Sequence, residues 1–332
     1  MLTLILIYLA LGALLSAAAL QRRAPRLRSI AAGLLVSYAV IALLFGAGEL
    51  FFRYAYAEPD GLPTLALRNW LDRHWQLNSA SYRDREWDPE AWAQRRTVVL
   101  VGDSFTAGWG IEDPADRFGD VLAARLGAGW AVINLGKEGT ATPGQLAQLR
   151  ALPLAQPDWI IWQYTLNDID DAALSIGLDP GLNPFAEMPA LAGESHLANF
   201  LYWRLAGAGT RGHGRYVDWL FSMYDHAVVW QIHAEQLNAV IDEVERRGAE
   251  LAVVIFPDMF FPFDSIPYVD RVAQVFEARG YGDRVLKLFD QAEAMPLAER
   301  IVSPRDGHPS AAFSRLVGDL IYARWFAGEG AS

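Results

Sequence analysis

The chain has 332 residues, a formal net charge of −11, no cysteine, and 52% hydrophobic residues against 20% charged ones. A chain of this length can bury a full core, which excludes disorder for most of it, and its acidity argues against a nucleic-acid partner. The absence of cysteine excludes disulfides, a thiolate nucleophile and a cysteine-ligated metal site. An apolar excess in an acidic chain must be concentrated in one part of it.

The apolar excess lies near the N-terminus. Residues Met1–Leu20 carry no charge, and Ile30–Gly48 form a second uncharged run. Each run is close to the ~20 residues that cross a bilayer as a helix. The loop at 21–28 between them contains four arginines and no acid. Because short basic loops stay in the cytoplasm, we predict two transmembrane helices, at 2–20 and 30–52, and a periplasmic domain after them. The predicted location is the bacterial inner membrane, with the chain crossing it more than once.

Two alternatives to this membrane anchor, residues 1–53, are open. A signal peptide could be cleaved at Ala17–Ala19, but its basic residues should precede the apolar stretch, and here the arginines follow it. Two buried helices of a soluble core should show a polar stripe with helical period, which neither run has. The anchor holds five arginines and one glutamate, which leaves 23 basic and 38 acidic residues, a net charge of −15, for the rest. We therefore expect an acidic globular domain behind an apolar anchor.

After the anchor, residues 54–95 are rich in Pro, Arg, Asp and Trp and indicate a connector, and residues 96–332 form the main domain. This domain alternates strands with helices and has a long insertion at about 171–232. Its apolar runs predict strands at Thr97–Val101, Trp130–Leu135, Trp159–Tyr164, Leu251–Phe256, and either Arg284–Phe289 or Arg300–Val302. Helical patterns cover 113–126, Pro143–Ala151, 234–247 and Pro309–Phe326. The alternation indicates an α/β fold with a parallel sheet covered on both faces, whose ligands bind beyond the carboxyl ends of the strands.

Residues that could take part in catalysis follow the predicted strands. They are Gly102-Asp103-Ser104 after the first strand, Gly136 after the second, Asn167-Asp168 after the third, and Asp306-Gly307-His308 before the last helix. A serine hydroxyl needs a base to take its proton, and histidine suits that task near neutral pH. A carboxylate can hold the base in one tautomer, and an oxyanion needs fixed donors. Together these residue types indicate acyl transfer.

In this order, the motifs resemble those of the SGNH/GDSL hydrolases along roughly residues 97–326. Gly102–Gly108 resembles the nucleophile block, Asn134–Gly139 the glycine block, Asn167-Asp168 the asparagine block, and Asp306–Ser310 the closing block. The resemblance implies a three-layer α/β/α sandwich with a central parallel sheet of about five strands in flavodoxin-like order, behind the two transmembrane helices.

The resemblance also implies roles for individual residues. Ser104 would be the nucleophile, His308 the base, and Asp306 the residue that orients it. The backbone N–H groups of Ser104 and Gly136, with the side chain of Asn167, would form the oxyanion hole. Asp103 and Asp168 would support these groups. No metal and no organic cofactor are expected.

The sequence departs from the family pattern in two places. Thr165 stands where the family usually has a glycine two residues before its asparagine. The closing block reads Asp-x-His, whereas the family commonly has Asp-x-x-His, so a backbone carbonyl could hold His308 in place of Asp306. Singly, the residues also have structural explanations, because Ser104 could cap a turn and Asn167-Asp168 could be a turn pair.

The insertion contains other candidates, for which we favour structural roles. Its histidines, which lack metal-ligand spacing, are His196, His213, His226 and His233. Its aromatic residues are expected to form helix core, with an acyl-chain cleft, a membrane-facing rim or a sugar platform as alternatives. These aromatic residues are Phe200, Tyr202, Trp203, Tyr216, Trp219, Phe221, Tyr224 and Trp230.

The expected function is that of a membrane-anchored, extracytoplasmic serine esterase or deacylase. Its substrate would be a small acyl ester, such as an acetyl ester, of an envelope carbohydrate or lipid, and the reaction would pass through an acyl-serine intermediate. A polysaccharide O-acetyltransferase would use the same residues. An accessory subunit of a membrane complex, which binds without catalysis, is the alternative from another class. The expected partners are the acyl-ester substrate and the bilayer, through residues 1–53, and not nucleic acid.

Overall fold

A computed structural model of the protein describes residues 2–21, 24–181, 188–205 and 208–328. The chain folds into two compact units. The larger unit consists of Pro59–Leu62, Leu71–Leu182 and Gly209–Ser332, and the smaller one of Met1–Glu58, Pro63–Trp70 and Asn183–Ala208. Each unit is described separately below.

A five-stranded sheet forms the centre of the larger unit. Its strands are β1 (Arg96–Val101), β2 (Trp130–Asn134), β3 (Trp159–Tyr164), β4 (Glu250–Ile255) and β5 (Val285–Lys287). They lie in the order β2-β1-β3-β4-β5, and every neighbouring pair is parallel. This order confirms the predicted flavodoxin-like parallel sheet. It places the residues that follow β1, β2 and β3 next to one another at one edge.

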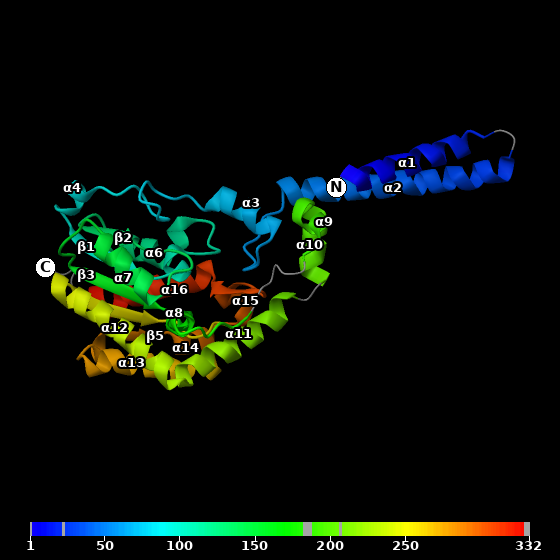
Figure 1. Cartoon of the computed structure of the whole chain (residues 1–332). Coiled ribbons are helices and arrows are strands. Elements are labelled where there is room, and N and C mark those ends of the chain that lie inside the picture. Colours follow the sequence, from blue (N-terminus) through cyan, green and yellow to red (C-terminus); the bar gives the residue numbers. More distant parts are fainter. Residues whose placement is uncertain (1, 22–23, 182–187, 206–207, 329–332) are drawn as a thin grey trace. The chain divides into compact units, whose positions relative to one another are not determined.

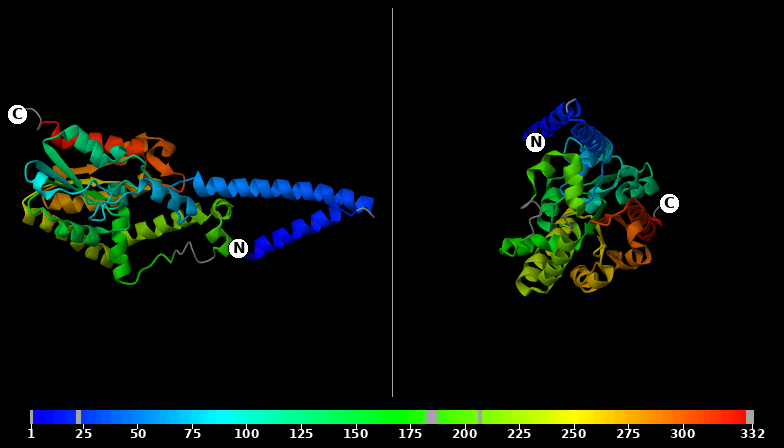
Figure 2. Two further views of the ribbon diagram at one scale, coloured as in Figure 1. Left: turned by 90° about the horizontal axis from the view of Figure 1, so that it is seen from above. Right: turned by 90° about the vertical axis from the view of Figure 1, so that its right-hand side faces the viewer.

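Helices cover both faces of this sheet (Figure 1). Side chains alternate along β1, so that Val99 and Val101 belong to one core and Val98 and Leu100 to the other. The first core is closed by α7 (Thr142–Ala151), α11 (Ala208–Asp225), α12 (Ala227–Arg247) and α13 (Pro262–Ala278). The second is closed by α6 (Phe118–Leu126), α14 (Phe289–Ala294) and α16 (Ala311–Ile321). Figure 2 shows the same three layers from two further directions, which confirms the α/β/α sandwich.

The remaining elements connect these layers. The helices are α3 (Leu65–His74), α4 (Pro89–Trp92), α5 (Ser104–Ala107), α8 (Asp170–Ser175) and α15 (Leu297–Arg300). The short 3₁₀ helices are η1 (Pro114–Asp116), η2 (Leu166–Ile169) and η3 (Gly282–Arg284), and the π-helix η4 (Tyr322–Phe326) continues α16. A separate antiparallel hairpin joins β6 (Ile301–Ser303) to β7 (Asp306–Pro309). The first of the two alternatives for the fifth strand is therefore correct, because the second one lies in this hairpin.

Three predicted helices have different limits in the structure. The helix predicted over 113–126 is interrupted at Arg117, whose backbone is extended, so a 3₁₀ turn precedes α6. The extended conformation directs the buried Arg117 side chain to Asp120. The closing helix begins after Ser310, which caps it by accepting a hydrogen bond from the N–H of Phe313, and not at Pro309, which ends β7. The helix predicted at 234–247 begins earlier, at Ala227.

The aromatic residues of the insertion mostly form core, as predicted. Trp203 and Tyr224 are buried, and Tyr216, Trp219, Phe221 and Trp230 are half-buried against core side chains. Among the insertion's histidines, His233 is fully buried and His226 caps α12. His196 begins α10 in the smaller unit. The side chain of His213 lies outside the described part of the structure.

In the smaller unit, α1 (Leu2–Ala19) packs against α2 (Pro25–Tyr54). Helix α2 is long and apolar enough to cross a membrane, whereas the apolar stretch found in α1, Tyr8–Ala19, is shorter. The structure thus supports the second predicted crossing by length and composition and leaves the first one a prediction. Tyr8 and Tyr38 join the two helices through stacked rings, and each hydroxyl donates to the other's backbone carbonyl, over 3.0 and 2.9 Å.

Part of the predicted insertion belongs to this smaller unit. It forms α9 (Ala190–Glu194) and α10 (His196–Leu205), which packs against α2. The carboxylate of Glu49 on α2 accepts hydrogen bonds from the Ser195 hydroxyl, over 2.7 Å, and from the N–H of Leu197, over 3.0 Å. An acidic side chain at the beginning of α10 satisfies backbone donors that a helix leaves unpaired. The insertion is therefore fastened to the helix that is long enough to span the membrane.

Candidate active site

Ser104 lies at the first position of α5, directly after β1. Asp103 caps this short helix, because its carboxylate accepts a hydrogen bond from the N–H of Phe105 over 2.8 Å. A Cβ atom on Gly102 would lie 2.2 Å from the Thr106 hydroxyl oxygen, so only glycine permits the tight turn from strand to helix. The turn brings Ser104 to the carboxyl edge of the sheet, where its side chain is only 8% exposed.

Ser104, His308 and Asp306 form a continuous hydrogen-bonded chain. The Ser104 Oγ lies 2.8 Å from Nε2 of His308. On the other side of the ring, Nδ1 of His308 contacts Oδ1 of Asp306. Both residues belong to β7, where positions i and i+2 face the same side of the strand. The Asp-x-His spacing therefore allows the Asp306 carboxylate to contact the His308 ring directly.

The electrostatics of the Ser104–His308–Asp306 chain favour a protonated His308 beside an ionised Asp306. Burial alone would lower the pKa of His308, but the carboxylate of Asp306, with weaker contributions from Asp103 and Glu138, raises it above its ordinary value. Burial alone would raise the pKa of Asp306, but His308 and the donors on its oxygens lower it overall. An imidazole that gains a proton beside an ionised carboxylate is the arrangement that a serine nucleophile requires of its base.

Asn167 lies on η2 after β3, with its side chain exposed at the same edge. The Thr165 hydroxyl lies 2.5 Å from the amide oxygen of Asn167 and 2.7 Å from Oδ2 of Asp103, so its one proton is shared between these two acceptors. Thr165, where the family pattern has a glycine, thus links Asn167 to the residue before Ser104. The amide oxygen is held toward Thr165, which leaves the NH₂ group of Asn167 to donate elsewhere.

Gly136 lies after β2, in direct contact with α5. A Cβ atom here would lie 2.2 Å from the backbone nitrogen of Ala107, which explains the glycine. Its N–H donates to the side-chain oxygen of Asn134 over 2.8 Å. The Asn134 amide in turn donates to the carbonyl of Thr106 over 2.8 Å. Gly136 therefore packs on the nucleophile helix, and the use of its N–H in an oxyanion hole stays a prediction.

Asp168 holds η2 against α7. Its buried carboxylate accepts hydrogen bonds from the Thr142 hydroxyl, over 3.1 Å, and from the Gln145 amide, over 3.0 Å. Burial, followed by the nearby charge of Asp103, raises its pKa well above the ordinary value. Asp168 thus fixes the turn that carries Asn167, and its supporting role in catalysis stays a prediction.

One residue at this site was not singled out by the sequence. The indole N–H of Trp109 donates to Oδ2 of Asp306 over 2.9 Å. The rings of Trp109 and Phe105 lie 5.7 and 5.1 Å from that of His308. In the sequence, Trp109 stands in a short Gly-Trp-Gly turn, which lacks the spacing and the basic residue of a phosphate loop. Its contact with a residue almost two hundred positions away carries no local signal.

Within the described ranges, no group of three or more His, Asp or Glu side chains is placed to hold a metal ion. The buried His233 bonds to the Tyr164 hydroxyl over 2.7 Å. It therefore belongs to a core network and does not act as a ligand.

A serine that faces an imidazole, with a carboxylate on the other ring nitrogen and glycine and asparagine turns beside it, is the arrangement that a serine hydrolase needs. The chain belongs to the GDSL-like lipase/acylhydrolase family, whose model matches residues 100–316. It is therefore an enzyme of the SGNH/GDSL hydrolase type.

Solved structures of similar fold include three bacterial proteins. A member of the lipolytic G-D-S-L family from Veillonella parvula is 11% identical, with a TM-score of 0.41, over 70% of this chain and 98% of its own. Esterase EstA from Pseudoalteromonas sp. is 14% identical, with a TM-score of 0.43, over 69% and 96%. A carbohydrate acetylesterase family member from Sinorhizobium meliloti is 15% identical, with a TM-score of 0.38, over 69% and 98%. No curated protein sequence matches the chain.

Proposed function

We propose that the protein is a membrane-anchored serine esterase or deacylase that acts outside the cytoplasm. Its substrate is a small acyl ester, such as an acetyl ester, of an envelope carbohydrate or lipid. The observation that carries the catalytic part is the distance of 2.8 Å between Ser104 Oγ and His308 Nε2, with Asp306 on the other ring nitrogen.

In the proposed reaction, His308 takes the hydroxyl proton of Ser104 while the serine oxygen attacks the ester carbonyl. The tetrahedral intermediate collapses to an acyl-Ser104 ester, and His308 gives the proton to the departing alcohol oxygen. A water molecule then loses a proton to His308 and attacks the acyl group. The acid leaves, and the proton returns to Ser104. Asp306 keeps the His308 ring in one tautomer and stabilises its charged form.

The proposed oxyanion hole consists of the backbone N–H groups of Ser104 and Gly136 and the NH₂ group of Asn167. The orientation of Asn167 supports its part, since its amide oxygen is occupied by Thr165. For Gly136, the bond that its N–H makes to Asn134 must be shared with the oxyanion or exchanged for it. Such a fixed donor is typically worth about 10²–10³ in kcat.

Labelling with a fluorophosphonate tests the proposed nucleophile. We expect the full-length protein in detergent to be labelled and Ser104→Ala not to be. Ser222→Ala, which removes an exposed hydroxyl on α11, is the matched control and should be labelled like the wild type. A folded wild-type protein that neither reacts with the probe nor hydrolyses p-nitrophenyl acetate would refute the proposed activity.

The apolar length of α2 and the arginines before and within its first turn support the proposed anchoring and orientation. The natural chain contains no cysteine, so single cysteines report topology cleanly. Ala24→Cys, before α2, should resist an impermeant maleimide in intact cells stripped of their outer membrane. Ala323→Cys, exposed near the C-terminus, should react with it. Reaction at Ala24→Cys alone would show the opposite orientation. Equal reaction at both positions would refute a crossing by α2.

A further inference from the structure

Both oxygens of the Asp306 carboxylate have donors. Oδ1 faces the imidazole of His308 and also accepts a hydrogen bond from the His308 backbone N–H over 3.0 Å. Oδ2 accepts from the indole N–H of Trp109 over 2.9 Å. Asp306 is 2% exposed, so water does not compete for these positions. A carboxylate held at both oxygens cannot rotate away from the ring that it orients.

Trp109 is also tied to the nucleophile helix. Its backbone N–H donates to the carbonyl of Ser104 over 2.9 Å, directly after Gly108, which ends α5 with φ = 77°. Its ring lies edge-on to that of Trp75, with 5.4 Å between the ring centres. Trp109 is thus joined to Ser104 through its backbone and to Asp306 through its side chain. Trp109 therefore bonds to both ends of the Ser104–His308–Asp306 chain.

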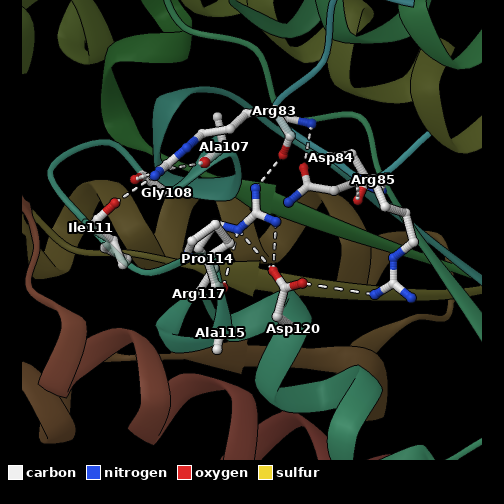
Figure 3. A network of polar contacts seen from close by, with 12 residues as sticks. Arg83, Asp84, Arg85, Ala107, Gly108, Ile111, Pro114, Ala115, Arg117 and Asp120 are labelled. Carbon is white, nitrogen blue, oxygen red and sulfur yellow. Dashed lines mark hydrogen bonds and ion pairs between the residues drawn. The ribbon is translucent and has the colours of Figure 1, made fainter. Parts of the chain in front are cut away.

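The loop that carries Trp109 is fastened by Arg83, which precedes the sheet in sequence (Figure 3). The Arg83 side chain is buried, and its guanidinium donates to the carbonyls of Gly108 and of Ile111, the latter over 2.6 Å. Arg117 donates to the backbone carbonyl of Arg83 and pairs with Asp120 at 2.8 Å. Since a guanidinium presents several donors in a fixed fork, it can bind carbonyls on both sides of Trp109 at once.

We propose that Trp109 is a positioning residue for the Asp306–His308 pair, and that Arg83 fixes the loop from which it acts. The inference rests on the proposed function of Ser104, His308 and Asp306. Through its indole N–H Trp109 acts on the Asp306 carboxylate, while its ring lies 5.7 Å from that of His308. It has no place in the four sequence blocks that define the site.

Removal of the indole N–H has a specific electrostatic consequence. Negative charge near His308 comes from Asp306 and, more weakly, from Asp103 and Glu138, and all three favour its protonated form. Without the donor on Oδ2, the negative charge of Asp306 is less stabilised and its carboxylate becomes more basic. The imidazole then holds its proton more tightly. The pH below which activity is lost should therefore rise.

The test is Trp109→Phe in the full-length protein, assayed in detergent with p-nitrophenyl acetate. We expect kcat to fall about tenfold, the effect of one hydrogen bond to a charged group, with KM changed less than twofold. The acid limb of the pH profile should move to higher pH. The matched control is Trp87→Phe, which loses an indole-to-carboxylate bond of 3.0 Å to Asp84. It should leave both kcat and the acid limb unchanged.

A double-mutant cycle separates positioning from simple damage to the fold. In an Asp306→Ala background, Trp109→Phe should cause no further loss, because the acceptor of the indole N–H is gone and phenylalanine keeps an aromatic ring beside His308. Equal losses in both backgrounds, or a Trp109→Phe enzyme with the kcat and pH profile of the wild type, would overturn the inference. These outcomes require an active wild type, so they are distinct from failure of the proposed activity.

Arg83→Lys tests the second half of the inference. A single ammonium group cannot reach carbonyls on both sides of Trp109, so kcat should fall while KM is kept. The double variant with Trp109→Phe should show a smaller fold-loss in kcat than the product of the two single fold-losses. A loss equal to that product would show that Arg83 acts independently of Trp109 and would overturn the role proposed for Arg83. Circular dichroism and urea unfolding confirm that each variant is folded.

Discussion

The hydroxyl of Thr165 lies 2.5 Å from the amide oxygen of Asn167, within the turn that follows β3. The family pattern has a glycine at the position of Thr165, which has no side chain to make such a bond. The threonine therefore supplies a constraint on the Asn167 amide that glycine would leave to the surrounding loop. The same hydroxyl also reaches Asp103, which joins the nucleophile turn to the asparagine turn.

Thr165→Val removes this hydroxyl and keeps the shape of the side chain. We expect kcat for p-nitrophenyl acetate to fall about tenfold, because the Asn167 amide loses its orientation and one donor to the oxyanion weakens. Thr165→Ser keeps the hydroxyl and should retain most of the activity. A Thr165→Val enzyme as active as Thr165→Ser would show that the bond does not orient a catalytic amide.

The pH dependence of the reaction should follow His308, which must be neutral to accept the Ser104 proton. Because Asp306 raises the pKa of His308, activity should be lost as the pH falls through a value above the ordinary one of about 6.5. Asp306→Asn removes the negative charge, so the acid limb should move to lower pH, opposite to its shift in Trp109→Phe. Its kcat should fall about 10²–10⁴-fold, as expected when the orienting carboxylate of a triad is lost.

Asp113→Asn is the control for this experiment, since Asp113 caps η1 and does not face His308. It should leave the acid limb in place. An acid limb unchanged in Asp306→Asn would mean that another group sets the pKa of the base.

Gly136→Ala should destabilise the protein as well as inactivate it. The added methyl group would lie 2.2 Å from the backbone nitrogen of Ala107, so α5 or the Gly136 turn must move. Overpacking of this kind costs typically about 1–3 kcal/mol. In Gly129→Ala, the new methyl group meets no atom within 4 Å, and stability should hardly change. Urea unfolding of the two variants in detergent measures the difference.

The buried His233 predicts a loss of stability in acid. Burial lowers its pKa to about 4, whereas in the unfolded chain it is about 6.5. Between these values the unfolded chain binds the proton and the folded protein does not, so this residue's contribution is lost as the pH falls from about 6.5 to about 4. The loss amounts to about 3 kcal/mol in full.

His233→Gln keeps a polar partner for Tyr164 and does not titrate. Its free energy of unfolding should therefore fall less between pH 7 and pH 5 than that of the wild type. His226→Gln, at the N-cap of α12, replaces an exposed histidine and should show the wild-type pH dependence. Parallel pH curves for the wild type and His233→Gln would contradict this assignment.

Local sequence patterns were sufficient to predict the central strands, the edge of the sheet that carries the candidate site and the apolar helix α2. The runs of β1 to β4 are apolar because a parallel strand is buried on both faces, and the structure confirms all four of them. Glycines and polar residues directly after these strands pointed to the site, since the topology of a parallel sheet brings such positions to one edge. The apolar composition of α2 likewise follows from residues that are neighbours in the chain.

Only the tertiary structure decided how distant segments meet. The sequence left Asp306 open as the partner of His308, and the β6–β7 hairpin settles the geometry by placing both side chains on one face. The bond from Trp109 to Asp306 depends on packing between segments far apart in the chain, and so does the hold of Arg83 on the loop of Trp109. Periodicity and turn chemistry encode burial and backbone shape, whereas the partner of a buried polar group is set by the packing that removes water from it.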